Sequence, residues 1–254
     1  MKNELLHIGP LTVYGYGLMI ACAVLAVYLT MEYRARKYRY EVQHVFPLFL
    51  WGLIGGLAGA KLFFLFTEWK DFVRDPGWYF MHFSDGFVVY GGIITGILFG
   101  WLYTRVHGLS FLAWADLVLP SVALGQGIGR IGCFLAGCCY GKETDLPIGI
   151  TFHTSEFAPN GISLFPTQLF SAAFDFLHFL ILIAIAKRKK RDGTVAVSYL
   201  LIYSVGRFAI EFFRGDPGRG TIGPFSTSQA IALAVSACVL LAVLPGFLKK
   251  KSGQ

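Results

Sequence analysis

Seven long apolar stretches, separated by polar or charged connections, make up most of this 254-residue chain. Each stretch approaches the roughly 20 apolar residues that a helix needs to cross the hydrocarbon core of a bilayer. The pattern predicts seven membrane-spanning helices, over residues 12–32, 45–66, 86–104, 114–136, 167–186, 194–213 and 227–248. The expected fold is an all-α polytopic membrane protein with one integral membrane domain over residues 1–254.

The two longer connections, residues 67–85 and 137–166, fall on the same side of the predicted membrane. Residues 67–85 interleave aromatic and charged side chains, which is typical of a helix lying in the headgroup layer. Residues 137–166 are rich in glycine, proline and polar residues. We expect the two segments to form a small cap on the outer, periplasmic face.

Composition and charge support the membrane assignment. The chain is 55% hydrophobic and 15% charged, against roughly 25% charged residues in soluble domains. Its net charge of +7 does not indicate nucleic acid, because the basic residues form short clusters between the spans. The clusters at 34–39, 105, 187–191 and 249–251 hold 13 of the 22 Lys and Arg residues on one side. The positive-inside rule then places the N-terminus outside and the C-terminus in the cytoplasm.

A single cation, Arg130, lies within the fourth predicted span, in a glycine-rich stretch that runs from Leu117 to Gly141. An arginine at the centre of a membrane helix costs roughly 2.5 to 3.5 kcal/mol on insertion scales, so it persists where protein, water or an anionic ligand receives it. The glycines around it let neighbouring helices or a bulky ligand approach the helix backbone closely. Arg130 therefore marks a candidate anion site within the bilayer.

Two other patterns in this stretch carry less weight. Residues 127–132 fit the GxGxxG dinucleotide pattern, but they lack the preceding strand and the later acid that this fingerprint requires. Cys133, Cys138 and Cys139 have no histidine or fourth thiol at zinc spacing, which favours a packing role over a metal site. A disulfide on the oxidising side stays open. We expect neither a metal nor a cofactor.

The sixth predicted span carries Arg207, Glu211 and Arg214, spaced i, i+4, i+7, so the three share one helix face. An ion pair between Glu211 and one arginine that merely ties helices together fits this pattern as well as a catalytic role does. Two arginines and one acid leave a positive charge over, and Arg130 adds another. A surplus of cation in a low-dielectric cleft favours a phosphate ligand, which matches the guanidinium fork.

Three residues near the first three spans are less specific candidates. Tyr90 opens the third span ahead of two glycines, Tyr16 begins the first span, and Lys61 lies in the second. Tyr90 also fits an ordinary interfacial aromatic residue, and the glycines fit a close-packing seam. Lys61 is either a buried cation or a lysine whose ammonium group reaches the interface.

In their order along the chain, these motifs resemble those of the bacterial prolipoprotein diacylglyceryl transferases. The resemblance covers essentially the whole chain. The matching segments are Tyr16–Met19, Gly59–Lys61, Tyr90–Gly92, Gly129–Phe134, Phe165–Leu169, and Arg207 with Glu211–Arg214. Six motifs in family order form a specific signal, whereas each one alone is weak.

The resemblance implies a multi-pass enzyme of the bacterial cytoplasmic (inner) membrane. It would move the sn-1,2-diacylglyceryl group of phosphatidylglycerol to the lipobox cysteine of a prolipoprotein, as the first step of lipoprotein maturation. The products would be a thioether and glycerol phosphate. The implied catalytic residues are Arg130, Arg207 and Tyr90. The implied lipid-binding residues are Arg130, Arg207, Arg214, Glu211, Tyr16, Lys61, Gly129, Gly132, Gly141 and Gln168.

The chain departs from better-known members of this family at four places. Tyr90 stands where they have histidine, Cys133 where they have asparagine, Lys61 where arginine is usual, and residues 136–138 where they have an Asn-x-Glu stretch. The histidine is their favoured base for the acceptor thiol. A tyrosine, with an ordinary pKa of about 10 against about 8.5 for a thiol, is a poor base. Either Tyr90 orients the lipid and the base is elsewhere or unnecessary, or the chain is a divergent branch with another acceptor.

A second class of function stays open beside the transferase. A transporter or scramblase that binds the same anionic lipid without chemistry would have similar buried cations. Such proteins often carry inverted repeats, and the sequence shows none. The sequence therefore favours the transferase, without indicating which prolipoproteins it modifies, which acyl chains it prefers or how it oligomerises.

Overall fold

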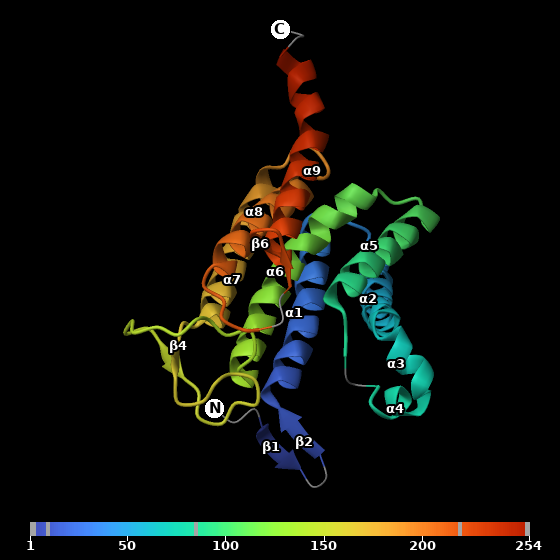
Figure 1. Cartoon of the computed structure of the whole chain (residues 1–254). Helices are drawn as coiled ribbons and strands as arrows, with labels where there is room; N and C mark the ends of the chain where they lie inside the picture. The colour runs from blue at the N-terminus through green and yellow to red at the C-terminus, as the bar shows by residue number, and fades with distance from the viewer. Residues whose placement is uncertain (1–3, 9–10, 84–85, 218–219, 252–254) are drawn as a thin grey trace. The chain divides into compact units, whose positions relative to one another are not determined.

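The computed structural model describes residues 4–8, 11–83, 86–217 and 220–251. Each predicted span contains a long helix. These helices are α1 (Gly15–Lys37), α2 (Val45–Thr67), α5 (Val89–Val106), α6 (Phe111–Ala136), α7 (Thr167–Arg188), α8 (Thr194–Glu211) and α9 (Thr227–Lys251) (Figure 1). The short helix η1 (Val42–His44) runs directly into α2. Within the described residues, five helical segments are long and apolar enough to cross a membrane: α1, Val42–Thr67 (η1 with α2), α6, α7 and α8. The structure is mostly helical with five candidate spans, and seven spans remain a prediction.

Shorter elements occupy the connections. The predicted outer segment 67–85 forms α3 (Trp69–Arg74) and α4 (Pro76–Met81), and residues 84 and 85 lie outside the described residues. Three antiparallel pairs of strands were not expected from an all-α fold. They are β1 (Glu4–Ile8) with β2 (Leu11–Tyr14), β3 (Ile150–Thr151) with β4 (Ser163–Leu164), and β5 (Thr221–Ile222) with β6 (Phe225–Ser226). The all-α prediction therefore holds for the long elements and misses these hairpins.

The chain divides into two compact units, one of residues 1–30 with 115–254 and the other of residues 31–114. In the second unit, α2 and α5 lie side by side (Figure 1). A Cβ atom at Gly92 would lie 2.9 Å from the carbonyl oxygen of Gly56, and one at Gly59 would overlap the side chain of Thr95. Thr95 Oγ1 also donates a 2.8 Å hydrogen bond to the carbonyl of Gly55. The predicted close-packing seam is thus confirmed within this unit.

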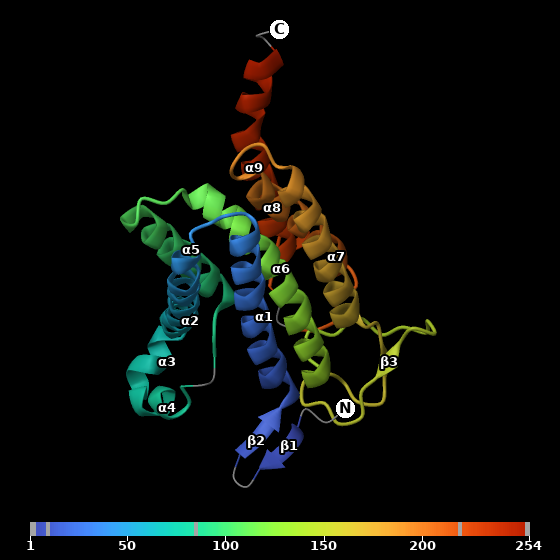
Figure 2. The same cartoon turned by 180° about the vertical axis from the view of Figure 1, so that it is seen from behind.

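The first unit includes α1 up to residue 30. This part of α1 lies beside α6, and α6 lies beside α7 (Figure 2). Glycines on α6 permit this approach. A Cβ atom at Gly125 would lie 2.6 Å from Val27 of α1, and one at Gly127 would lie 2.7 Å from the ring of Phe176 on α7. Because side chains of α1 and α7 pack against the backbone of α6 at these glycines, the segment of α6 that carries Arg130 is held between two neighbours.

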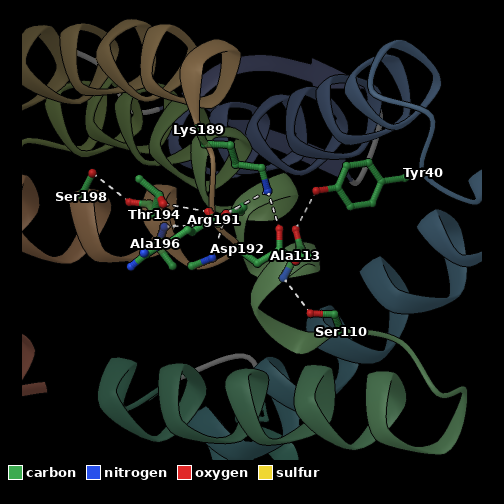
Figure 3. A network of polar contacts seen from close by, with 11 residues as sticks. Tyr40, Ser110, Ala113, Lys189, Arg191, Asp192, Thr194, Ala196 and Ser198 are labelled. Atoms are coloured by element: carbon green, nitrogen blue, oxygen red, sulfur yellow. Dashed lines mark hydrogen bonds and ion pairs between the residues drawn. The ribbon is translucent and has the colours of Figure 1, made fainter. Parts of the chain in front are cut away.

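A polar network fixes the connection from α7 to α8. Lys189 Nζ lies 2.9 Å from Asp116 Oδ2 and 3.1 Å from Asp192 Oδ1, and Figure 3 shows Lys189 directed toward Asp192. The buried carboxylate of Asp116 also accepts hydrogen bonds from the backbone N–H groups of Gly193 and Ala196, at 2.9 and 2.8 Å. A carboxylate at a helix N-terminus satisfies free donors and complements the helix dipole. Asp116 on α6 therefore sets where α8, which carries Arg207, begins.

Candidate functional site

The first unit brings the predicted arginines of α6 and α8 into one polar cluster. Arg130 is only partly exposed, and it interacts electrostatically with Tyr203 of α8, Asp175 of α7, Cys133 and Cys139. None of the carboxylates in the described part of the chain forms an ion pair with Arg130. A guanidinium group that is enclosed by helices but has no ion-pair partner is suited to receive an anionic ligand.

Arg207 forms the ion pair that the spacing predicted. Its terminal nitrogen lies 2.9 Å from Glu211 Oε2 and donates a 2.8 Å hydrogen bond to the hydroxyl of Ser228 on α9. Glu211 is buried, whereas the side chain of Arg207 remains 17% exposed. The pair therefore positions Arg207 and leaves part of its guanidinium group accessible.

Arg214 does not share the helix face with Arg207 and Glu211 in the way predicted. Helix α8 ends at Glu211, and Arg214 lies beyond it in an isolated β-bridge with Gly141. The guanidinium of Arg214 makes a two-pronged contact with Asp216, in which Nε lies 2.8 Å from Oδ1. Burial lowers the pKa of Arg214, but the hydrogen bond to Asp216 and the nearby Cys139 and Glu211 more than offset this and raise it.

The expected surplus of positive charge around the arginines is wrong. The sequence pattern predicts one acid, Glu211, for three arginines, but Asp216 pairs with Arg214, and Asp175 interacts electrostatically with Arg130 and Arg207. Three acids thus accompany three arginines. Affinity for an anion must then depend on the geometry of Arg130, whose guanidinium has no ion pair among the described residues, rather than on the summed charge.

Three cysteines lie beside the arginines. Cys133 is in the last turn of α6, and Cys138 and Cys139 follow in the loop, with all three Sγ atoms within 4.8 Å of one another. Hydrogen bonds from Cys133 and Cys138 lower the pKa of Cys139, and Arg214 and Arg130 act in the same direction, whereas hydrogen bonds with Cys133 and Cys139 raise the pKa of Cys138. A thiolate in this loop is therefore favoured at Cys139, next to the candidate anion site.

Two buried residues at the start of α7 hold the loop that carries Cys138 and Cys139, called the cysteine loop below. Thr167 Oγ1 donates a 2.7 Å hydrogen bond to the carbonyl of Cys139, and Gln168 Nε2 donates one of 2.8 Å to the carbonyl of Cys138. Both side chains are 1% exposed. Gln168 was predicted to bind lipid, and the structure places it as a support for the loop beside Arg130. Direct contact with a lipid stays a prediction.

Gly141 joins three backbone segments at the base of this cluster. Its N–H donates to the carbonyl of Phe165 at 3.1 Å, and Gly215 N donates to the carbonyl of Tyr140 at 3.0 Å. A Cβ atom at Gly141 would overlap the backbone of Phe165. The absence of a side chain at this position therefore allows the backbone of Phe165, just before α7, to lie against Gly141, which also forms the β-bridge with Arg214.

The two predicted glycines that flank Arg130 face α1. A Cβ atom at Gly132 would lie 3.1 Å from Met19 and 3.4 Å from the ring of Tyr16, and one at Gly129 would lie 3.9 Å from Ile20. Tyr16 is 42% exposed and interacts electrostatically with Arg130 and the three cysteines. The glycines thus allow α1 to place Tyr16 at the edge of the cluster.

Lys61 and Tyr90 belong to the second unit. Lys61 is 5% exposed, and its Nζ lies 5.0, 4.9 and 5.3 Å from the ring centroids of Phe64, Phe83 and Phe87. Cation–π contacts of this kind stabilise a desolvated ammonium group. Tyr90 lies in the first turn of α5 and is 43% exposed. Just before this helix, the N–H of Val88 donates a 3.0 Å hydrogen bond to the carbonyl of Ala60. The predicted roles of Lys61 in lipid binding and of Tyr90 in catalysis remain predictions.

Comparison with known proteins agrees with the motif order. The family model described as prolipoprotein diacylglyceryl transferase matches residues 3–244. The chain belongs to this family. A phosphatidylglycerol–prolipoprotein diacylglyceryl transferase of Clostridium tetani is 45% identical over 92% of this chain and 93% of its own length. Proteins with this activity in their names from Clostridium perfringens and Gloeobacter violaceus are 42% and 33% identical, over 92% and 98% of this chain and 91% and 94% of their own lengths.

Sequence reasoning missed several residues that surround the arginines in this family member. Asp175 and Tyr203 lie within predicted spans, and an ionisable group inside a membrane helix is itself a signal of a site. Asp216 follows the sixth span at a position that no periodicity connects to Arg214. The convergence of the three cysteines depends on the turn after α6, which the spacing alone did not show.

Proposed function

We propose that this chain transfers the diacylglyceryl group of phosphatidylglycerol to the lipobox cysteine of prolipoproteins, as the names of its relatives say of them. The observation that carries the proposal is the partly exposed side chain of Arg130. It interacts electrostatically with Arg207 and with neighbouring thiols, and it has no ion pair among the described residues. Family membership supplies the reaction, and the arginines supply a place for the phosphate of the lipid.

The change in charge during the reaction explains the arginines. The acceptor sulfur attacks the terminal glyceryl carbon, the bond from that carbon to the phosphate oxygen breaks, and the oxygen keeps the electron pair. The phosphate thereby passes from a diester with one negative charge to a monoester that approaches two. Donors aimed at this oxygen stabilise the transition state more than the bound lipid, and so raise the rate. We assign this role to Arg130 and Arg207.

The remaining residues act through position. Glu211 orients Arg207, Asp216 orients Arg214, and Gln168 and Gly141 support the loop and the segment next to Arg130. We further propose that Tyr16, Gly129 and Gly132 bind the lipid beside Arg130. From the family motifs we propose that Lys61 also binds lipid.

We place the enzyme in the bacterial cytoplasmic membrane, as one integral domain with seven spans, an outer N-terminus and a cytoplasmic C-terminus. The distribution of basic residues supports this orientation. In a variant with serine at Cys22 and Cys238, we expect the Lys189→Cys thiol to react with a membrane-impermeant reagent only after the cells are opened. Labelling of that thiol in intact spheroplasts would reverse the proposed orientation.

Tyr90 is expected to hydrogen-bond the lipid headgroup rather than to remove the proton of the acceptor thiol. Tyr90→Phe should therefore retain transfer within about 10-fold of the parent chain, whereas loss of a general base costs roughly 10² to 10⁴-fold. The measurement is the rate of peptide lipidation between pH 6 and 9 in the same membranes. A collapse at every pH with lipid binding unchanged would identify Tyr90 as the base.

Function in the cell is tested by complementation. A bacterium depleted of its own prolipoprotein diacylglyceryl transferase should regain lipid-modified lipoproteins when it produces this chain, and should not when it produces the Arg130→Ala variant at equal membrane abundance. Accumulation of unmodified prolipoproteins with both chains would contradict the proposal. Rescue by Arg130→Ala would separate the function from the site.

A further inference from the structure

The sulfur atoms of the three cysteines next to Arg130 lie close enough together for a metal site, although the positions of the cysteines in the sequence do not match a zinc motif. Their Sγ atoms all lie within 4.8 Å of one another. A tetrahedral Zn²⁺ with Zn–S distances of about 2.3 Å brings its sulfur ligands to about 3.8 Å apart. A contraction of about 1 Å, which side-chain rotation can supply, would let the three sulfurs of Cys133, Cys138 and Cys139 bind one ion.

The backbone explains how neighbouring cysteines point to one centre. Gly137 and Cys139 both have positive φ angles, 78° and 57°, and the N–H of Cys138 bonds back to the carbonyl of Cys133 at 3.1 Å. The chain therefore turns sharply at the end of α6 and folds Cys138 and Cys139 over the last helical turn. A non-glycine residue with positive φ costs on the order of 1 to 3 kcal/mol and persists where the surroundings enforce it.

The loop is also held from outside, as ligand-bearing loops usually are. The hydrogen bonds from Thr167 and Gln168 fix the carbonyl groups of Cys139 and Cys138. Because both donors are buried at the start of α7, the direction of the two thiols depends on a rigid helix terminus rather than on the loop alone. The loop that carries Cys138 and Cys139 is thus held through its backbone carbonyl groups rather than through the sulfur atoms.

Charge and access favour an open site. Three thiolates and one Zn²⁺ leave a single negative charge, and Cys139 interacts electrostatically with both Arg130 and Arg214. All three cysteines are partly exposed, and the group contains no fourth ligand from the described residues. Three protein ligands with a free fourth position are typical of catalytic rather than structural zinc.

We propose, building on the function proposed above, that Cys133, Cys138 and Cys139 bind Zn²⁺ and that the acceptor thiol takes its fourth coordination position. Binding converts the S–H group of the acceptor to a thiolate, since thiols that coordinate zinc lose their proton. That sulfur then forms the bond to the glyceryl carbon as the carbon–oxygen bond to phosphate breaks. The released proton ends on the glycerol phosphate, and no group is oxidised or reduced.

This site would answer the question of thiol activation. Position 90 holds tyrosine rather than histidine, and acids accompany the arginines among the described residues of the first unit, so zinc would supply an ionising charge that those arginines do not supply in surplus. Zinc lowers the pKa of a bound thiol directly. The neutral thioether product is a weaker ligand than the thiolate, so it can leave the ion.

The first test measures metal content. The full-length protein, purified in detergent without chelators and supplied with Zn²⁺, should hold about one zinc ion per chain after desalting, consistent with a three-thiolate site. Serine variants of Cys133, Cys138 or Cys139 should lose it, whereas serine at the two exposed cysteines, Cys22 and Cys238, should not. Equal zinc in all variants, or a disulfide within the group in protein alkylated under non-reducing conditions, would overturn the proposal.

The second test separates the metal site from the reaction. X-ray absorption of the zinc-loaded protein should show three sulfur ligands, and four after addition of a lipobox peptide with cysteine but not with serine. Removal and return of zinc should lower and restore the transfer rate by at least about 10-fold, because a free thiol is only a few per cent thiolate at neutral pH. Full transfer by metal-free protein would overturn the zinc proposal and leave the transferase intact. A four-sulfur site without any transfer would refute the transferase instead.

Discussion

Replacing Arg130 by lysine is expected to slow diacylglyceryl transfer almost as much as replacing it by alanine. Arg130 has no ion pair among the described residues, so its fork of donors is available to the phosphate. A lysine keeps the charge but presents a point donor that cannot make two parallel bonds to one phosphate. Loss of a donor that stabilises developing negative charge costs roughly 10² to 10³-fold in rate.

The measurement is single-turnover transfer from phosphatidylglycerol in vesicles with wild-type, Arg130→Lys and Arg130→Ala proteins of equal abundance. Arg74 on α3 provides the control, because its side chain is 81% exposed and its ion pair among the described residues is with Asp71 at 3.4 Å. Arg74→Lys should leave the rate unchanged. Near-normal turnover of Arg130→Lys would mean that position 130 supplies only a charge.

A single methyl group at Gly141 is expected to disturb the site from a distance. The Cβ atom of Gly141→Ala would overlap the backbone of Phe165, which cannot rotate away, and would separate the segments that join the cysteine loop to Arg214. Overpacking of this kind costs about 1 to 3 kcal/mol. We expect a lower midpoint of thermal unfolding. We also expect a transfer rate reduced by about 10-fold or more, because a misplacement of roughly 1 Å in a site can cost about 10²-fold in rate.

Gly52→Ala is the matched control, because a Cβ atom at Gly52 would lie more than 4 Å from every described residue outside its own stretch of α2. Thermal unfolding in detergent and transfer in vesicles should both be unchanged in that variant. If Gly141→Ala behaved like Gly52→Ala, the backbone contacts of Gly141 would not control the position of Arg214.

The long helices could be predicted from the sequence because hydrophobic length alone determines them. The predicted span 45–66 and helix α2, for example, agree to within one residue. The hairpins could not be predicted, since strands of two residues such as Ile150–Thr151 carry no periodicity. The end of α8 was placed too late because the apolar pattern continues through Phe212 and Phe213, whereas the backbone after Glu211 pairs with the cysteine loop.

The candidate site was predictable only where it follows helix geometry. The pair of Arg207 with Glu211 follows from i, i+4 spacing on one helix. The contact of Arg214 with Asp216 depends on a loop, and the electrostatic interaction of Arg130 with Asp175 depends on the packing of α6 against α7. No local pattern encodes either of them. The same holds for the cysteines, whose approach depends on the positive φ angle of Cys139.

The most direct test of the central claim is transfer by the purified protein in vesicles. Wild-type protein, phosphatidylglycerol with labelled acyl chains and a lipobox peptide should give a peptide whose cysteine carries a labelled diacylglyceryl thioether, together with glycerol phosphate in equal amount. Phosphatidylcholine as donor, or a peptide with serine in place of cysteine, should give no product. Lipid binding or movement of lipid between leaflets, without any modified peptide, would contradict the account and favour a lipid transporter or scramblase.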